Sequence, residues 1–320
     1  MNRLLVAGGG TGGHVYPLLA VLEALRQEEG QVEVHYLGRS QSVEERLARA
    51  HGLEFRSIPA GVAAWLARRP VVVCLPDMAP GLAVRLLSRL ARTVTVSFEE
   101  VGGRLPAGKA VVTGYPVRQA LLQGNRLEAR RRLGVAPDER VLVVLGGSSG
   151  SRNVNEAVVE ILPELLQLAR VFHLTGALDY ERVCARREEL DTCTQESYQI
   201  YSFVEQELAD LLWAADLVVA RAGAATLGEF PAVGVPSVLV PGRFAGGHQA
   251  LNATYLKDRG AALVIEDDDL PERLLPTVRD LLQDPERLMA MAAAAKSLAR
   301  PQACQAIVAE LRRAADRRPQ

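Results

Sequence analysis

The sequence is poor in cysteine, has no long apolar run and carries almost no net charge. Its four cysteines show no Cys-x-x-Cys spacing, which is typical of reduced thiols in a cytosolic protein. No apolar stretch approaches the roughly 18–20 residues of a membrane-spanning helix, and the stretch that follows Met1 is too short for a signal peptide. The net charge of −1 at pH 7 gives no basic field that would favour nucleic acid. We therefore expect a soluble intracellular protein, free or bound at a membrane surface.

Short apolar or β-branched runs alternate with helical patterns along all 320 residues. Strands that crossover helices bury on both faces have such continuous apolar runs, and alternating strands and helices imply mostly parallel sheets. A chain of this length with 48% hydrophobic residues has room for two domains. The sequence therefore predicts an α/β protein with two doubly wound, Rossmann-like parallel sheets. The strands are expected near residues 3–8, 32–37, 55–59, 71–75, 93–98, 110–114, 141–146, 170–176, 198–203, 217–220, 237–241 and 262–266.

A charged, proline-bearing and helix-poor stretch separates the two series of strands and is the predicted linker. It covers residues 117–138, between a first domain over residues 1–116 and a second domain over residues 139–300. The segment from about 285 to 315 is rich in Ala, Leu and Arg and is predicted to be purely helical. Residues 301–320 are expected to form a C-terminal helix that packs back on the first domain.

Each predicted domain opens with a strand that runs into a glycine-rich turn, Gly8–Gly13 in the first and Gly146–Gly150 in the second. Such a turn presents backbone N–H groups at the start of a helix, where anions bind. The alternative is a tight turn that only packs helix against strand. A nicotinamide site would need an acidic residue at the end of the second strand, where this chain has Leu37-Gly38-Arg39, and neither turn has the Gly-Lys-Ser/Thr ending of a P-loop.

A third glycine turn, Arg221-Ala222-Gly223, is predicted to lead into a helix that contains Glu229 about two turns from its start. A carboxylate there can accept hydrogen bonds from the two hydroxyls of a ribose; the alternative is a glutamate on a solvent-exposed helix face. The acidic run over residues 266–269 precedes a proline-led helix, so we interpret it as a helix-capping loop and not as a metal site.

Seven motifs carry a resemblance to a known family: GGTGGHVYP (9–17), GYPVR (114–118), LGGSSGSRNVN (145–155), HLTG (173–176), RAGAATLGE (221–229), GVPSVLVP (234–241) and HQALNA (248–253). In this order they resemble the MurG family of peptidoglycan glycosyltransferases, which are GT-B enzymes of glycosyltransferase family 28. The resemblance implies two domains facing each other across a cleft, the first for the acceptor and the membrane, the second for UDP-N-acetylglucosamine (UDP-GlcNAc).

The implied reaction transfers N-acetylglucosamine with inversion from UDP-GlcNAc to undecaprenyl-pyrophosphoryl-N-acetylmuramoyl-pentapeptide (lipid I), giving lipid II. It needs no cofactor and no metal. The implied partners are the donor, the lipid-linked acceptor, an anionic membrane surface and other proteins of cell-wall synthesis, but no nucleic acid. The protein is then expected in the cytoplasm, peripheral on the inner face of the cell membrane. The alternatives are a GT-B transferase with another acceptor, a UDP-sugar-binding protein without transferase activity, and a UDP-sugar epimerase or hydrolase.

The resemblance also implies roles for individual residues. The implied donor-binding residues are Thr11, Gly12, Gly13, Arg118, Gly147, Ser148, Phe203, Val204, Ala224, Ala225, Thr226, Glu229, His248, Gln249 and Asn252. The implied acceptor-binding residues are Gly10, Thr11, His14 and Tyr16. Among the donor residues, Phe203 and Val204 flank the uracil and Arg118 faces the phosphates. His14 is the expected general base, because its pKa class suits proton transfer near neutral pH, with Asp77 as the second choice.

The chain departs from the family pattern mainly in its acceptor half. Several tens of residues are absent near Gly61, between the third and fourth predicted strands, and Asp77 stands where the family has an asparagine. His248 replaces the first residue of a Gln-Gln pair that reads the sugar. Four residues remain of the membrane-facing patch: Trp65, Leu66, Arg68 and Arg69.

Overall fold

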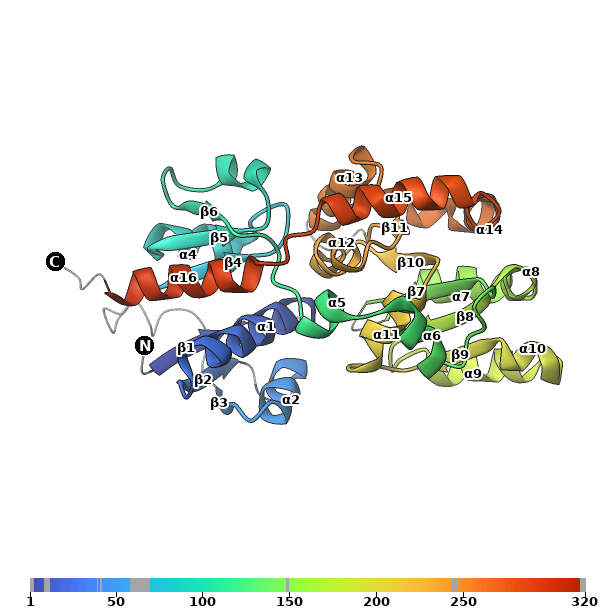
Figure 1. Ribbon diagram of the computed structural model, residues 1–320, viewed down its shortest axis with the longest axis horizontal. Coiled ribbons are helices and arrows are strands. Elements are labelled where there is room, and N and C mark those ends of the chain that lie inside the picture. Colours follow the sequence, from blue (N-terminus) through green and yellow to red (C-terminus); the bar gives the residue numbers. More distant parts are fainter. Residues whose placement is uncertain are drawn as a thin grey trace. The chain divides into compact units, whose positions relative to one another are not determined.

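The computed structural model describes residues 3–8, 12–38, 40, 42–57, 70–147, 150–242 and 247–316, and for residues 12–14, 43, 57 and 193 it describes the backbone alone. The chain forms two compact units (Figure 1). The first unit comprises Met1–Gln119 together with Arg300–Gln320, and the second unit comprises Ala120–Ala299.

A six-stranded parallel sheet forms the centre of the second unit, in the strand order β12-β11-β10-β7-β8-β9. Its strands are β7 (Val141–Leu145), β8 (Arg170–Leu174), β9 (Tyr198–Tyr201), β10 (Leu217–Arg221), β11 (Ser237–Val240) and β12 (Ala262–Val264). Each pair of neighbours is parallel, so every strand ends at the same edge of the sheet. Leu142 and Val143 point to opposite faces and both are fully buried, as the continuous apolar runs predict.

Helices cover the sheet of the second unit. They are α5 (Gln119–Gln123), α6 (Arg126–Arg132), α7 (Arg152–Glu160), α8 (Leu162–Leu168), α9 (Tyr180–Glu188), α10 (Thr192–Glu196), α11 (Glu207–Ala214), α12 (Glu229–Val233), α13 (His248–Asp258), α14 (Leu270–Leu282) and α15 (Pro285–Ser297), with the 3₁₀ helices η2 (Ala224–Leu227) and η3 (Asp267–Asp269). Helices α7, α8 and α14 pack in one core with Leu142, Val144 and Val219 of the central strands.

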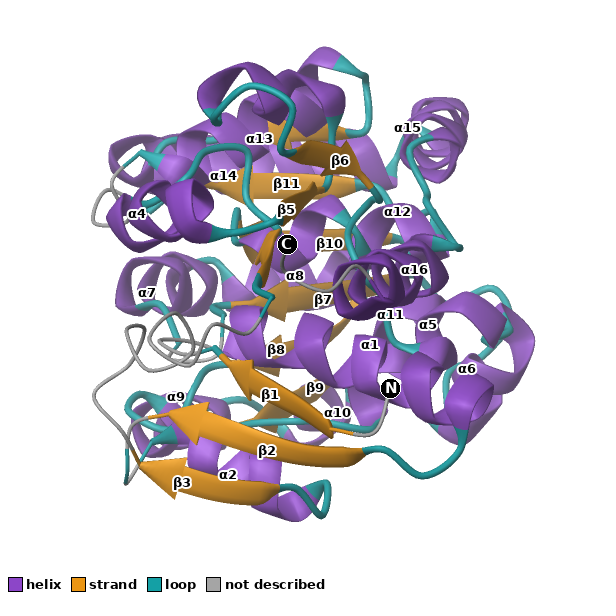
Figure 2. Ribbon diagram, turned by 90° about the vertical axis from the view of Figure 1, so that its left-hand side faces the viewer, coloured by secondary structure: helices purple, strands orange, loops and turns teal. Residues whose placement is uncertain are grey.

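The first unit contains two three-stranded parallel sheets, in the orders β1-β2-β3 (Figure 2) and β4-β5-β6 (Figure 1). Their strands are β1 (Arg3–Ala7), β2 (Glu33–Gly38), β3 (Glu54–Ser57), β4 (Val72–Leu75), β5 (Thr93–Val96) and β6 (Ala110–Val112). The helices are α1 (Gly12–Glu29), α2 (Val43–Ala50), α4 (Leu82–Leu90), the 3₁₀ helix η1 (Glu99–Arg104) and α16 (Ala303–Asp316). Helix α16 packs against α1, where Ile307 and Val308 join a core with Leu22 and Leu25.

The α/β class, the parallel sheets and each of the predicted strands are confirmed. The first unit differs from the single doubly wound sheet that the sequence predicts, because β1 and β4 are not paired among the described residues. The crossover from β3 to β4 covers only residues 58–71, which is close to the minimum of about a dozen residues for joining parallel strands. Such a short connection restricts how β4 can align beside β1.

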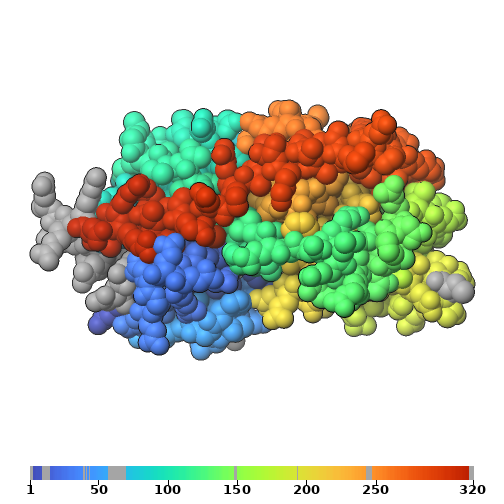
Figure 3. All heavy atoms as spheres, in the orientation of Figure 1, coloured from blue at the N-terminus to red at the C-terminus, as the bar shows by residue number. Residues whose placement is uncertain are grey.

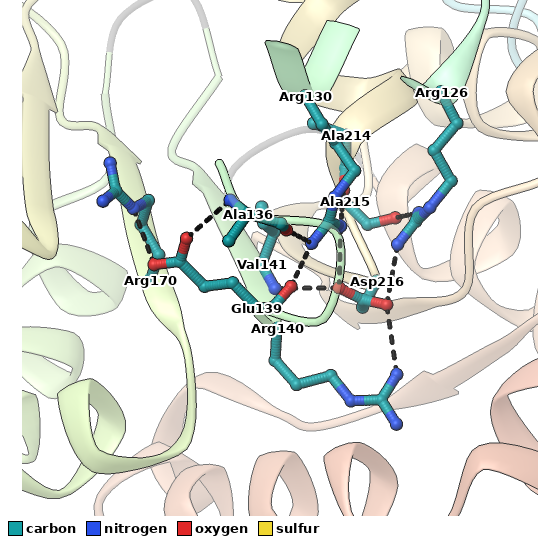
Figure 4. A network of polar contacts seen from close by, with 10 residues as sticks. All are labelled: Arg126, Arg130, Ala136, Glu139, Arg140, Val141, Arg170, Ala214, Ala215 and Asp216. Carbon is teal, nitrogen blue, oxygen red and sulfur yellow. Dashed lines mark hydrogen bonds and ion pairs between the residues drawn. The ribbon is translucent and has the colours of Figure 1, made fainter. Parts of the chain in front are cut away.

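The stretch expected to be a helix-poor linker instead contains α5 and α6, at the surface of the second unit (Figure 3, green). Two of its arginines form ion pairs with a residue far along the chain. Asp216 accepts a hydrogen bond from Arg126 at 2.8 Å. Arg130, which is only 4% exposed, pairs with the same carboxylate at 3.5 Å and donates to backbone carbonyls around it (Figure 4). Long-range ion pairs therefore order a segment whose composition is that of a linker.

The segment over residues 285–315, which is predicted to be helical, consists of two helices. Helix α15 ends at Ser297 and α16 begins at Ala303, on either side of Pro301, which cannot donate a helical hydrogen bond. Within the described ranges, no helix is both long and apolar enough to cross a lipid bilayer.

Candidate active site

The order of the strands in the second unit reverses between β7 and β10. From β7 the chain adds β8 and β9 on one side, and from β10 it adds β11 and β12 on the other. In open α/β sheets, ligands bind outside the carboxyl ends of the strands at such a switch point. Leu145 of β7 pairs with Ala220 of β10, so the loops that follow these two strands leave the sheet side by side. The loop after β7 is a predicted anion-binding turn, and the loop after β10 contains residues that the family resemblance implies in donor binding.

The loop after β7 is shaped by close backbone packing. Gly150 has φ +78°, and a Cβ atom there would overlap the carbonyl oxygen of Thr175, which follows β8. Gly147 has φ +85°, but nothing described lies within 4 Å of the Cβ position. Packing therefore explains Gly150, whereas the positive φ of the turn explains Gly147. Ser148 lies outside the described residues.

Arg221 joins the two loops. Its Nε donates to Ser151 Oγ at 2.7 Å, and its Nη1 pairs with Asp267 at 2.7 Å. The Arg221 side chain is 14% exposed and that of Asp267 is 8% exposed. The expectation that residues 266–269 cap the next helix is wrong. Asp269 occupies the N-cap position of α14, but its side chain makes no capping hydrogen bond. Asp267 instead neutralises a buried arginine.

Glu229 lies at the start of a helix and not two turns inside one. The predicted helix is divided into the 3₁₀ helix η2 and the short helix α12, with Gly228 between them at φ −125°. Glu229 is the first residue of α12 and is only 6% exposed, so the alternative of a solvent-exposed glutamate is wrong. Glu229 follows the 221–226 loop, which leaves the carboxyl end of β10.

The side chains of three other predicted donor residues form hydrogen bonds with the backbone of loops in the second unit. Thr226 Oγ1 donates to the Gly223 carbonyl at 2.8 Å. Asn252 is fully buried, and its amide donates to the Ala222 carbonyl at 3.0 Å. Gln249 Oε1 accepts from Gly242 N at 2.7 Å, in the turn after β11. Asn252 and Gln249 thus bind protein backbone in this structure, and any contact between their side chains and a sugar stays a prediction.

The remaining predicted donor residues of the second unit lie around the same edge. Ala224 and Ala225 form the first turn of η2, and His248 begins α13. Phe203 and Val204 follow β9, and Phe203 is 38% exposed whereas Val204 is 7% exposed. The accessible ring of Phe203 thus lies in the segment after β9, and β9 is two strands away from β7 in the sheet.

A buried polar network that the sequence analysis did not assign lies beneath the β7 loop. His173 of β8, Asn155 of α7 and Tyr198 of β9 are all fully buried, and His173 is hydrogen-bonded to each of the other two. Burial lowers the pKa of His173 to about 3, so its ring is neutral at physiological pH. The signals in the sequence are a histidine within the apolar strand pattern of residues 170–174 and the presence of Asn155 and His173 in two of the motifs that carry the family resemblance, although no role is assigned to either.

Two predicted residues of the first unit contact each other. The Arg118 guanidinium lies over the ring of Tyr16, with 4.7 Å from Cζ to the ring centroid, a distance typical of a cation–π interaction. Asp77 follows β4 and is partly buried. Gly10 and Thr11 lie outside the described residues, and the side chain of His14 is not described.

Helix α4 of the first unit presents an apolar stripe that the sequence analysis missed. Leu82, Leu86 and Leu90 are spaced four residues apart and are 85%, 60% and 41% exposed, so they lie on one face of the helix. Arg85 and Arg89 are exposed on the same helix. The predicted patch at residues 65–69 lies outside the described residues.

No group of three or more His, Cys, Asp or Glu side chains that could hold a metal ion occurs in the part of the chain that the structure describes.

The chain matches the glycosyltransferase family 28 C-terminal domain over residues 141–307 and the family 28 N-terminal domain over residues 4–62. It is 34% identical over 360 residues to the UDP-N-acetylglucosamine–N-acetylmuramyl-(pentapeptide) pyrophosphoryl-undecaprenol N-acetylglucosamine transferase of Desulforudis audaxviator, covering 96% of both chains. The protein of the same name from Moorella thermoacetica is 36% identical over 361 residues, covering 96% of this chain and 97% of its own length. Both alignments exceed the 320 residues of this chain, so these relatives contain residues without a counterpart here.

Solved structures show the same fold. The crystal structure of Acinetobacter baumannii MurG superposes with a TM-score of 0.74 at 25% identity, covering 98% of this chain and all of that one. The UDP-GlcNAc 2-epimerase of Neisseria meningitidis superposes with a TM-score of 0.69 at 14% identity, covering 98% of this chain and 100% of the epimerase. The second likeness concerns the fold alone.

Proposed function

The chain belongs to glycosyltransferase family 28, and we propose that it transfers N-acetylglucosamine from UDP-GlcNAc to undecaprenyl-pyrophosphoryl-N-acetylmuramoyl-pentapeptide, forming lipid II for peptidoglycan synthesis. The observation that carries this proposal is the agreement with relatives named for this activity over 96% of the chain, which includes both units. A different acceptor, or a UDP-sugar-binding protein without transfer, would satisfy the fold alone and is not favoured.

The donor is proposed to bind at the switch-point edge of the second unit. Its two phosphates would accept hydrogen bonds from backbone amides at the start of α7 and in the 221–226 loop. The loops that contain these amides follow the paired ends of β7 and β10. The buried carboxylate of Glu229 would accept from the ribose hydroxyls, and the exposed ring of Phe203 would lie against the uracil. Support for this placement comes from the convergence of these groups on one edge of one sheet.

The proposed reaction is a direct displacement with inversion at the anomeric carbon. The acceptor hydroxyl oxygen forms a bond to C1 of the sugar while the bond from C1 to the diphosphate oxygen breaks, and UDP leaves with that electron pair. The hydroxyl proton passes to a general base, for which His14 is the first candidate and Asp77 the second. Both assignments rest on the family resemblance.

Charge develops on the departing diphosphate during this step. We propose that backbone amides of the second unit and the guanidinium of Arg118 meet this charge without a metal ion. Preorganised donors of this kind are worth several kcal/mol in a transition state. The contact of Arg118 with Tyr16 holds the guanidinium within the first unit, and its action on the donor stays a prediction.

A lipid-linked acceptor requires the protein to work at a membrane, and we propose peripheral binding to the inner face of the cell membrane. The stripe of Leu82, Leu86 and Leu90 supports this, because exposed apolar side chains on one helix face can enter the headgroup region. Arg85 and Arg89 on the same helix would attract anionic lipids, at about 1 kcal/mol for each charge near the surface.

Calorimetric binding of UDP-GlcNAc and turnover with a lipid I analogue together test the function. We expect donor binding and acceptor-dependent release of UDP. Binding without turnover would instead support a sugar-nucleotide-binding protein, and UDP release without acceptor would support a hydrolase or an epimerase. No binding of UDP-GlcNAc would overturn the proposal.

A further inference from the structure

Four polar side chains form a buried network next to Thr175, the residue on which the end of the β7 loop packs. His173, Asn155 and Tyr198 are fully buried, and Asp179, which follows β8, is 5% exposed. Asn155 Nδ2 donates to the Thr175 carbonyl and to Asp179 Oδ2, both at 2.9 Å. His173 bridges Asn155 Oδ1 at 3.0 Å and the Tyr198 hydroxyl at 2.7 Å. The network therefore connects α7 with β8, with the segment that follows β8 and with the first residue of β9.

The chemistry of the partners determines where each proton lies. Asn155 uses both N–H groups as donors, so its Oδ1 can only accept, and His173 Nε2 must carry the ring proton. The neutral ring then accepts at Nδ1 from the Tyr198 hydroxyl. Each hydrogen bond has one defined direction, and the Asn155 amide is held in a single orientation.

Asn155 also links the network to the backbone of the loop. Its own N–H donates to the Ser151 carbonyl at 2.9 Å, in the first turn of α7. The Thr175 carbonyl that its amide holds is the atom against which the Gly150 backbone packs. The bond to Ser151 belongs to the backbone, whereas the Asn155 side chain ties the first turn of α7 to the segment after β8 on which the end of the β7 loop packs. The amides at the start of α7 are the proposed phosphate donors.

We propose that Asn155, oriented by His173, is a positioning residue that sets the backbone amides at the start of α7, residues 151–153, for the donor diphosphate. This inference rests on the proposed function. A site made of backbone amides needs donor–acceptor distances within a few tenths of an ångström, so it depends on how precisely the backbone is held. A core residue that served packing alone would be apolar, as its neighbours Val154 and Val158 are, because burying an amide is costly unless every hydrogen bond is made.

The test compares UDP affinity with thermal stability in the full-length protein. Asn155→Ala should raise the calorimetric Kd for UDP by at least about tenfold, the scale observed when a residue that orients ligating groups is removed. The matched control is Asn125→Ala at the opposite edge of the sheet, where Asn125 caps α6 by accepting from Leu127 N and Glu128 N at 2.9 and 3.2 Å. The control should lower Tm and leave the Kd for UDP unchanged.

A second pair of variants keeps the inference testable if Asn155→Ala does not fold. His173→Phe removes the donor to Asn155 and should weaken UDP binding, whereas His173→Gln retains an amide donor and should restore much of it. Folded variants that bind UDP as tightly as the parent protein would overturn the positioning role and leave the proposed function standing. A parent protein that does not bind UDP would overturn both.

Discussion

Arg221 donates to Ser151 Oγ at 2.7 Å and pairs with Asp267 at the same distance. Because Ser151 precedes α7 and Arg221 ends β10, this one side chain joins the two loops at the switch point. Asp267 reaches the arginine from the 3₁₀ helix η3, so the arrangement depends on three separate segments of the chain.

Arg221→Met should therefore affect both stability and donor binding. It leaves the buried carboxylate of Asp267 without its partner, a change that typically costs about 3–5 kcal/mol, and it frees the loops from each other. Urea unfolding and UDP calorimetry measure the two effects. The control is Arg273→Met, because Arg273 pairs with Asp269 at 3.4 Å with both side chains about half exposed, and such pairs contribute at most about 1 kcal/mol. Equal losses in the two variants would contradict this account.

Glu229→Ala should weaken donor binding through the ribose. A hydrogen bond to a charged group is worth about 1.5–3 kcal/mol, which corresponds to a rise of roughly 10- to 150-fold in the Kd for UDP. The specific readout is the preference for UDP over 2′-deoxy-UDP, which the variant should lose. Glu272→Ala, which replaces an exposed glutamate of α14, is the control. A variant at Glu229 that still prefers the ribonucleotide would remove Glu229 from the donor site.

The burial of His173 predicts a pH dependence of stability. The pKa of His173 is lowered from 6.5 to about 3 by burial, which the nearby charge of Asp179 only partly opposes. Below pH 6.5 the His173 ring binds a proton in the unfolded chain but stays neutral in the folded chain. The free energy of unfolding therefore decreases as the pH falls from 6.5 towards 3. At pH 5 this loss is about 2 kcal/mol.

Urea unfolding at pH 7 and pH 5 measures this contribution. His173→Gln should lose about 2 kcal/mol less than the parent protein between the two pH values. His51→Gln, at an exposed site, is the control for the substitution itself. An identical pH dependence in the parent protein and His173→Gln would show that the buried ring does not resist protonation.

The stripe on α4 should bind lipid bilayers. Replacing Leu82 and Leu86 by Ser should reduce cosedimentation with vesicles that contain anionic lipid by at least about tenfold, because each fully buried leucine contributes about 1.5–3 kcal/mol. Leu127→Ser is the control, since Leu127 is a 73% exposed leucine on α6 of the second unit. Unchanged cosedimentation of the double variant would assign membrane binding to another surface.

The sequence predicts the strands well because each is a continuous apolar run, as in Val141–Leu145. It fails where distant residues decide the local structure. Nothing near Arg130 shows that Asp216 will bury it, so an ordered segment resembles a linker. The acidic run at 266–269 resembles a capping loop because its partner, Arg221, is more than forty residues away in the sequence.

The same limit applies to the candidate site. The glycine turns and Glu229 are identifiable from spacing, although Gly228 divides the helix that the spacing assumes. The Asn155–His173 network is not, because its members come from α7 and β8 and meet only when the sheet has formed. Local patterns therefore indicate the loops that face a ligand, but not the buried residues that hold them.

The final helix has a consequence for biosynthesis. Helix α16 supplies Cys304, Ile307 and Val308 to the core that β1 and α1 begin at the other end of the sequence. The hydrophobic core of the first unit cannot be completed until the ribosome has synthesised this helix. By then every residue of the second unit, Ala120–Ala299, has been translated. The half of the protein that is made first is thus the last to be completed, and nascent chains stalled before Ala303 would expose the apolar face of α1 to chaperones.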